Sequence, residues 1–333
     1  MTVRSSLLAH VQTWRPYTVW YAGLLGLAGA GLVHAGYDWP RLALAWATPT
    51  LGWIGGHYLG DYFDRELDAI GKPQRPIPSG RLAARTALVC GIAGLLAVAV
   101  LSVAGGLGTA LVAVLAVTGI VAYGWVLKAR GLSGNLTRGA IGGLTIVFGA
   151  AAMAPRSLAS SVPLVLTFVV AVWAHDTSSN LVGTLRDMYG DRLGGYRTVP
   201  IRRGARVAGL TALRFYKLFV AAAVVGGILA PGGRLPYFVV LAAALVPGAR
   251  AWLIVFGRRS RDRPAGALRA HELLVLERIA FAGAVITLGF GVLAAAVLVA
   301  PMLAATWWTQ SRLRMGYELG ALARRKPTAP AQT

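Results

Sequence analysis

The chain has 333 residues, of which 56% are hydrophobic and only 14% charged, and its formal net charge is +21. A soluble globular domain carries about 25% charged residues, so this composition argues against a water-soluble enzyme. The basic excess lies between apolar stretches without an aromatic-and-basic recognition module, which disfavours a nucleic-acid partner, and the single cysteine, Cys90, excludes an intrachain disulfide.

Apolar stretches long enough to span a bilayer recur along the chain, because a spanning helix needs about 20 apolar residues. In chain order they cover 17–36, 42–60, 86–104, 108–127, 139–154, 161–182, 208–229, 236–256 and 277–300. We therefore predict an all-α polytopic membrane bundle of about nine transmembrane helices. We expect residues 1–308 to form a single domain, and the basic segment 309–333 to be a disordered C-terminal tail.

The basic residues predict the orientation of these helices in the cell membrane. The links after the even-numbered stretches hold most of the lysine and arginine, whereas the links after the odd-numbered ones hold only Arg41, Arg156 and Arg234. By the positive-inside rule, the N-terminus and the even-numbered links are cytoplasmic. Nine crossings would place the basic tail outside, so either the tail is tolerated there or the last stretch does not cross once.

An acidic cluster follows the second stretch. It holds Asp61, Asp64, Glu66 and Asp68, in a chain with only twelve acidic residues. On a continuous helix Asp61, Asp64 and Asp68 would share a stripe roughly 60° wide with His57. Stacked carboxylates repel one another, so they need a cation or basic partners, and a basic run with Arg75 follows.

A second acidic cluster ends the sixth stretch. Asp187 and Asp191 share a helical face with Asn180, and arginines such as Arg197 follow them. Both clusters end even-numbered stretches, so both face the cytoplasm and can meet at one site. Paired carboxylates ringed by basic groups suit a diphosphate carried by Mg²⁺, with an apolar tail among the helices. We therefore expect a central cavity open to the cytoplasmic side.

The acidic motifs resemble those of the UbiA superfamily of intramembrane prenyltransferases. Residues 60–68 (GDYFDRELD) and 75–80 (RPIPSG) are similar to the family's N-D-x-x-D-x-x-x-D and R-P-x-x-S-G segments. Residues 187–191 (DMYGD) and 195–200 (GYRTVP) are similar to its second motif. The resemblance also includes 123–128 (YGWVLK) followed by Asn135, and extends over most of the chain.

The resemblance implies a role for each matching residue in a Mg²⁺-dependent prenyltransferase. This enzyme would ionise an isoprenoid diphosphate and transfer the prenyl group to an unknown lipophilic acceptor. The implied metal ligands are Asp61, Asp64, Asp68, Asp187 and Asp191. The implied substrate-binding residues are Arg15, Arg75, Tyr123, Lys128, Asn135 and Asn180. Catalysis would rest on Asp64, Asp68, Asp187, Asp191 and Lys128.

One position departs from the family pattern, because Gly60 stands where the motif has asparagine. A neutral ligand is therefore missing from the first cluster, and water or Asn180 could replace it. Two alternatives to the transferase stay open at this point. One is a membrane terpene cyclase that uses the same metal site without an acceptor, and the other is a cation-coupled transporter.

Overall fold

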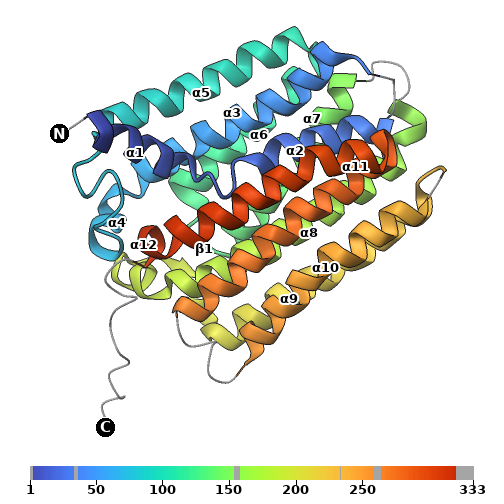
Figure 1. Ribbon diagram of the computed structural model, residues 1–333. Coiled ribbons are helices and arrows are strands. Elements are labelled where there is room, and N and C mark those ends of the chain that lie inside the picture. The colour runs from blue at the N-terminus through green and yellow to red at the C-terminus, as the bar shows by residue number, and fades with distance from the viewer. Residues whose placement is uncertain (1–2, 34–36, 154–157, 233, 258–263, 320–333) are drawn as a thin grey trace.

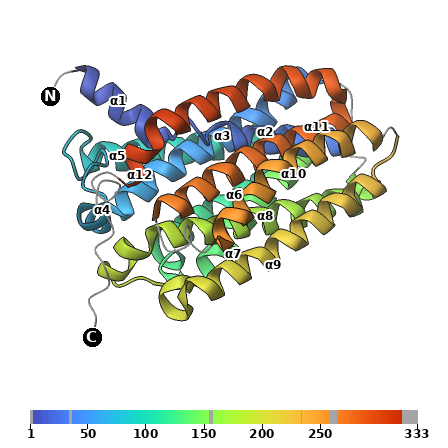
Figure 2. The same ribbon diagram turned by 60° about the horizontal axis from the view of Figure 1, so that its bottom comes forward.

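The computed structural model describes residues 3–33, 37–153, 158–232, 234–257 and 264–319. It is a bundle of long helices, and the short helices α1, α4 and α12 lie together at one of its ends (Figures 1 and 2). The first half consists of α1 (Val3–Trp14), α2 (Trp20–Val33), α3 (Trp39–Phe63), α4 (Arg65–Gly71), α5 (Ala84–Ala104), α6 (Leu107–Ala122) with the π-helical turn η1 (Tyr123–Leu127), β1 (Arg130–Gly131) and α7 (Leu132–Met153). The second half consists of α8 (Leu158–Leu193), β2 (Arg197–Thr198), α9 (Val199–Leu229), α10 (Arg234–Phe256), α11 (Pro264–Thr309), the π-helical turn η2 (Gln310–Arg314) and α12 (Met315–Glu318).

Helix α2 forms the centre of the bundle and is buried on all sides from Tyr21 to its end. Its glycines allow neighbouring backbones to come unusually close. A Cβ added to Gly26 would lie 1.9 Å from the carbonyl oxygen of Ala45 in α3, and one added to Gly29 would lie 2.0 Å from that of Ile146 in α7. Small residues at such crossings let helices pack tightly where no hydrophobic effect drives them together.

The outer surface of the bundle is apolar, as expected for helices that face lipid. Leu253 of α10 and Leu293 of α11 are 76% and 78% exposed. Among the described residues, seven helical segments are long and apolar enough to cross a membrane, and α2 is a shorter apolar helix. The predicted stretches up to residue 256 each coincide with one helix, although 34–36 and 154 lie outside the described residues. The count of nine single crossings is not confirmed, because the ninth stretch differs from this pattern.

The last predicted stretch, 277–300, is wrong as a single span. Gly291 has φ 81°, a left-handed conformation that breaks α11 into two helical runs. The runs are antiparallel, because a Cβ added to Gly283 would lie 3.1 Å from the Val299 side chain and Gln310 donates a hydrogen bond to the Glu272 carbonyl. The chain therefore returns to the end of the bundle at which α11 began. This reversal removes the conflict that nine single crossings created for the basic C-terminal segment.

The C-terminal tail is expected to be disordered from residue 309, but the structure is helical beyond that point. Residues 309–318 are helical, and Arg314, Tyr317 and Glu318 are buried. They are ordered because the reversal at Gly291 carries them back onto the acidic end of the bundle, where they find charged partners. Residues 320–333, the rest of the expected tail, lie outside the described residues, as does Arg156 in the link after the fifth stretch.

Candidate functional site

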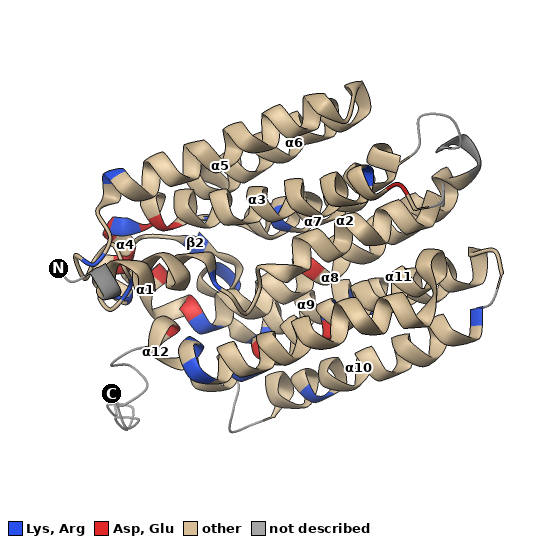
Figure 3. Ribbon diagram, turned by 45° about the horizontal axis from the view of Figure 1, so that its top comes forward, with Lys and Arg blue, Asp and Glu red and all other residues tan. Residues whose placement is uncertain are grey.

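The two acidic clusters meet at one end of the bundle, where the charged residues coloured in Figure 3 gather around α4, α12 and β2. Helix α4 packs on the end of α8, and a Cβ added to Gly71 would lie 3.3 Å from the Cα of Gly190. The strands β1 and β2 pair in parallel, with Arg130 opposite Arg197. This pairing joins the loop that carries Lys128 to the loop that follows the second cluster.

The first cluster does not form the continuous helical stripe that the sequence suggested. Helix α3 ends at Phe63 and α4 begins at Arg65, with Asp64 between them. The carboxylate of Asp61 points to other partners: Arg15 Nη2 donates to its Oδ1 at 2.7 Å and Tyr317 donates to its Oδ2 at 3.0 Å. Asp61 lies in the last turn of α3, before this break, and does not line the cavity described below.

Asp64 and Asp68 of the first cluster are also paired with basic residues. Arg75 Nη1 donates to Asp68 Oδ2 at 2.8 Å. Lys128 Nζ donates to Asp64 Oδ2, and the Tyr196 hydroxyl lies 3.3 Å from Asp64 Oδ1. The predicted basic partners thus contact the predicted acidic residues, which links positions that lie far apart in the sequence.

The second cluster is held in the same way. Arg186 donates two hydrogen bonds to Asp187, at 2.9 and 2.7 Å, and Lys72 Nζ lies 2.8 Å from Asp187 Oδ1. Thr198 Oγ1 donates to Asp191 Oδ2 at 3.3 Å. Each carboxylate of this cluster therefore has a donor supplied by its own helix, by the loop after α4 or by β2.

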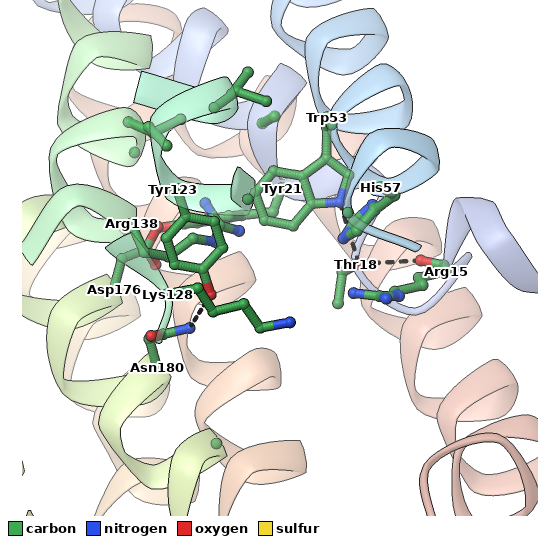
Figure 4. Close-up of a pocket in the computed structure, with 18 of the residues that line it drawn as sticks. Arg15, Thr18, Tyr21, Trp53, His57, Tyr123, Lys128, Arg138, Asp176 and Asn180 are labelled. Atoms are coloured by element: carbon green, nitrogen blue, oxygen red, sulfur yellow. Dashed lines mark hydrogen bonds between the residues drawn. The ribbon is translucent and has the colours of Figure 1, made fainter. Parts of the chain in front are cut away.

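A chain of polar side chains joins the predicted substrate-binding residues on α7, α8 and η1. Asn135 Nδ2 donates to Asn180 Oδ1 at 2.6 Å. Asn180 Nδ2 lies 3.4 Å from the Tyr123 hydroxyl (Figure 4). Asn180 is thus occupied by Asn135 and Tyr123, whereas Gly60 lies on α3. The replacement of the missing motif asparagine by Asn180 stays a prediction.

These groups surround the mouth of a cavity of about 260 Å³. Asp64, Asp187 and Asp191 line it together with Lys72, Lys128 and Arg75. Its inner walls carry the apolar side chains Val98, Val112, Val117, Ile120, Leu144 and Phe148 from α5, α6 and α7. The cavity therefore has a charged mouth and an apolar inner wall formed by α5, α6 and α7. A smaller adjoining cavity of about 40 Å³ is lined by Asp68, Asp187 and Asp191.

A second layer of charge, which the sequence did not predict as a site, lies deeper in the same cavity. The guanidinium carbon of Arg138 lies 4.3 Å from the centre of the Trp53 ring, and that of Arg278 lies 4.4 Å from the centre of the Tyr21 ring (Figure 4). Arg278 also lies 3.7 Å from Asp176. The sequence gave no sign of this cluster, because Arg138, Asp176 and Arg278 lie in three different helices, α7, α8 and α11.

Electrostatics fix the protonation of the groups at the mouth. Burial lowers the pKa of Lys128, but the Asp64 carboxylate beside it more than compensates and raises the pKa above its usual value, so Lys128 is a cation at neutral pH. Burial, with Asp64 nearby, raises the pKa of Tyr196 to about 12, so its hydroxyl keeps the proton that it can donate. Burial also raises the pKa of Asp68, against the opposing effect of Arg75.

The donor set fits Mg²⁺ in its chemistry. Mg²⁺ prefers carboxylate oxygens, and four aspartates from both clusters, Asp64, Asp68, Asp187 and Asp191, line the two adjoining cavities. In the arrangement seen here, lysine, arginine and hydroxyl groups occupy these carboxylates. Within the described part of the chain, no three His, Cys, Asp or Glu side chains converge closely enough to hold a metal. Binding of the ion therefore requires the basic side chains to exchange the carboxylates for another anion.

Sequence reasoning missed several residues of this mouth. Arg186 directly precedes Asp187, so its position in the second motif was a usable signal. Tyr196 and Thr198 lie in the segment after that motif. Glu318 gave no signal, because it follows the last apolar stretch by many residues and reaches the site only through the reversal at Gly291.

Comparisons with known proteins agree with this arrangement. The model of the UbiA prenyltransferase family matches residues 18–274. The chain is 29% identical to a digeranylgeranylglyceryl phosphate synthase of Thermococcus kodakarensis over 80% of this chain and 92% of the relative. It is 31% identical to one of Halobacterium salinarum over 79% of this chain and 93% of the relative.

Solved structures show the same fold. A UbiA homolog from Archaeoglobus fulgidus, bound to GPP and Mg²⁺, superposes with a TM-score of 0.66 at 14% identity, covering 91% of this chain and 99% of that one. A digeranylgeranylglyceryl phosphate synthase structure superposes with a TM-score of 0.64 at 22% identity, covering 86% of this chain and 99% of that one. At these identities, the likeness concerns the fold.

Proposed function

Because the chain belongs to the UbiA prenyltransferase family, we propose that this integral membrane prenyltransferase uses Mg²⁺ to transfer the prenyl group of an isoprenoid diphosphate to a lipophilic acceptor. One observation carries the proposal. Two aspartate clusters and their basic partners meet at the mouth of a cavity with an apolar inner wall. A diphosphate head and a hydrocarbon tail match these two parts in charge and polarity.

The basic side chains at the mouth would bind the diphosphate. Lys128 is a permanent cation, and Arg75 is fixed by hydrogen bonds from two of its nitrogens. Charge-assisted bonds from such groups to phosphate oxygens are stronger than neutral ones. In this role Lys128 and Arg75 exchange Asp64 and Asp68 for the phosphate oxygens, which frees these carboxylates.

The freed carboxylates of Asp64, Asp68, Asp187 and Asp191 would hold the metal. When bound, Mg²⁺ neutralises charge on the departing diphosphate. Asp61 is a weaker candidate than the other four, because it lines neither cavity and its two oxygens accept hydrogen bonds from Arg15 and Tyr317. We therefore assign Asp61 to positioning Arg15 rather than to direct metal contact.

The reaction follows from this arrangement. The carbon–oxygen bond of the isoprenoid breaks, and the diphosphate leaves with the electron pair toward the basic mouth. The allylic cation remains against the apolar wall, where the acceptor forms the new bond and loses a proton. The polar chain of Tyr123, Asn135 and Asn180 lies beside Lys128 and would orient the reacting end of the isoprenoid (Figure 4).

For the acceptor we propose a glyceryl phosphate lipid, following the name of the relatives. Arg138 supports this choice. It lines the cavity, close enough to Asp176 to interact with its charge, but among the described residues it has no ion pair of its own. Its guanidinium, stacked on Trp53, would bind the acceptor's phosphate deeper than the diphosphate mouth.

The comparisons favour neither the terpene cyclase nor the cation-coupled transporter. A turnover assay separates all three. The purified protein in lipid nanodiscs is given Mg²⁺ and geranylgeranyl diphosphate, with and without geranylgeranylglyceryl phosphate. We expect diphosphate release to need the acceptor and to yield a doubly prenylated product. A cyclic hydrocarbon formed without acceptor would contradict the transferase, and the absence of any binding of the diphosphate would contradict both enzymatic functions.

We also propose that the acidic end of the bundle faces the cytoplasm in the cell membrane. The loops at this end carry the basic excess on which the positive-inside rule depends. Cysteine-labelling from either side of sealed vesicles, in a variant with a cysteine at exposed Arg85, tests this orientation. Labelling from the outside only would contradict it.

A further inference from the structure

We propose that Glu318 is a built-in competitor of the diphosphate: its carboxylate occupies the anion site formed by Lys72, Arg75 and Arg186, and helix α12 leaves when the diphosphate binds. The inference rests on the proposed function. It adds Lys72 and Arg186 to the diphosphate-binding residues, and it gives the C-terminal helix a role in controlling access to the mouth.

The contacts of Glu318 are those of a bound anion. Arg75 Nη2 donates to Oε2 at 2.9 Å, Lys72 Nζ lies 3.3 Å from the same oxygen, and Arg186 Nη1 lies 3.2 Å from Oε1. The side chain is 4% exposed, and all four residues line the cavity. Three cations, two from the loop after α4 and one from α8, therefore converge on a single carboxylate that comes from a distant part of the chain.

The rest of α12 is attached to the same mouth. Tyr317 donates to Asp61, and its ring lies 4.9 Å from the guanidinium carbon of Arg75. Gln74 Nε2 donates to the Tyr317 carbonyl at 2.9 Å. The turn η2 before α12 is π-helical, an irregularity that weakens the helix at the point where α12 would have to swing away. Helix α12 itself has only four residues, so few helical bonds oppose its release.

Charge gives the reason for displacement. Lys72 and Arg75 also contact Asp187 and Asp68, the carboxylates proposed to hold the metal. Once Mg²⁺ binds Asp68 and Asp187, Glu318 would be the anion that competes with the phosphate oxygens for Lys72 and Arg75. Two like charges a few ångströms apart in a partly buried site repel strongly. The diphosphate, with more charge and more acceptor oxygens than a carboxylate, is the stronger ligand.

The first test compares Glu318→Gln with the wild type in equilibrium binding of geranylgeranyl diphosphate in the presence of Mg²⁺. The amide keeps the shape of the side chain but loses the charge, so we expect the Kd to fall about tenfold. Glu66→Gln is the matched control, because Glu66 is an exposed carboxylate that contacts only Arg65 in the described structure. We expect its Kd to be unchanged. An unchanged or higher Kd for Glu318→Gln would show that the carboxylate positions the basic groups instead of competing.

The second test uses the wild-type protein and so does not depend on the folding of a variant. Hydrogen exchange of the backbone amides in 310–319 is followed before and after the addition of inorganic pyrophosphate with Mg²⁺, and then of geranylgeranyl diphosphate. We expect faster exchange in this segment with either ligand. Unchanged or slower exchange, with binding established by saturation, would overturn the displacement of α12. If the wild type binds neither ligand, the proposed function itself has failed.

Discussion

The most direct perturbation of the proposed mouth is Lys128→Met, which removes the charge and keeps the aliphatic stem. Lys128 lies in the loop between η1 and β1, beside Asp64 and Tyr196. The substitution should weaken the binding of an isoprenoid diphosphate because one of its cations is lost. The fold should persist, since the Lys128 side chain is about a third exposed rather than part of the apolar core.

The magnitude follows from charge and exposure. Two unit charges 4 Å apart interact by about 1 kcal/mol in water and about 4 kcal/mol at the effective dielectric constant near a protein surface. With 31% of its side chain exposed, Lys128 falls between these limits, at about 2 kcal/mol. This free energy corresponds to a Kd about 30-fold higher, since each 1.4 kcal/mol is about a factor of ten.

The assay is equilibrium binding of geranylgeranyl diphosphate to purified protein with saturating Mg²⁺. Lys217→Met is the matched control, because Lys217 is an exposed lysine on α9 that does not line the cavity. Its Kd should not change. If Lys128→Met binds the diphosphate as tightly as the wild type while remaining folded, the basic mouth is not the diphosphate site, and the assignment of Lys128 is wrong.

Three further predictions test other parts of the structure. Asp64→Asn or Asp187→Asn should abolish turnover, as should excess EDTA with the wild type, and full activity in the chelator would exclude a metal-dependent reaction. Gly60→Asn should fold normally, since an added Cβ meets no heavy atom within 4 Å. It should lower the Mg²⁺ concentration that gives the half-maximal rate. An unchanged or higher Mg²⁺ requirement with intact substrate affinity would contradict the interpretation that Gly60 marks a missing metal ligand. Gly29→Ala should lower the thermal unfolding temperature, because its Cβ would lie 2.0 Å from a backbone oxygen and overpacking costs about 1–3 kcal/mol, whereas Gly60→Ala should leave it unchanged.

The sequence by itself determined the class of the protein and most of its helices. Apolar stretches of spanning length require helices, since lipid offers no partner to an unpaired backbone amide. Asp187 and Asp191 are predicted to share one face of a helix, and both lie in the continuous helix α8. The family resemblance, carried by motifs around both acidic clusters, is confirmed by the family match over 18–274. These features are local in the chain, and local patterns are what a sequence displays directly.

The tertiary structure alone decided which charged residues meet. A helix break at Asp64 interrupts the predicted stripe, and Arg15 and Tyr317, from opposite ends of the chain, meet at Asp61. The reversal at Gly291 depends on a single glycine in a left-handed conformation within an otherwise unbroken apolar segment, and hydropathy does not register it. It carries Glu318 onto Arg75, which lies 243 positions earlier in the chain. Such contacts depend on the packing of whole helices against one another, so no spacing within one stretch of sequence encodes them.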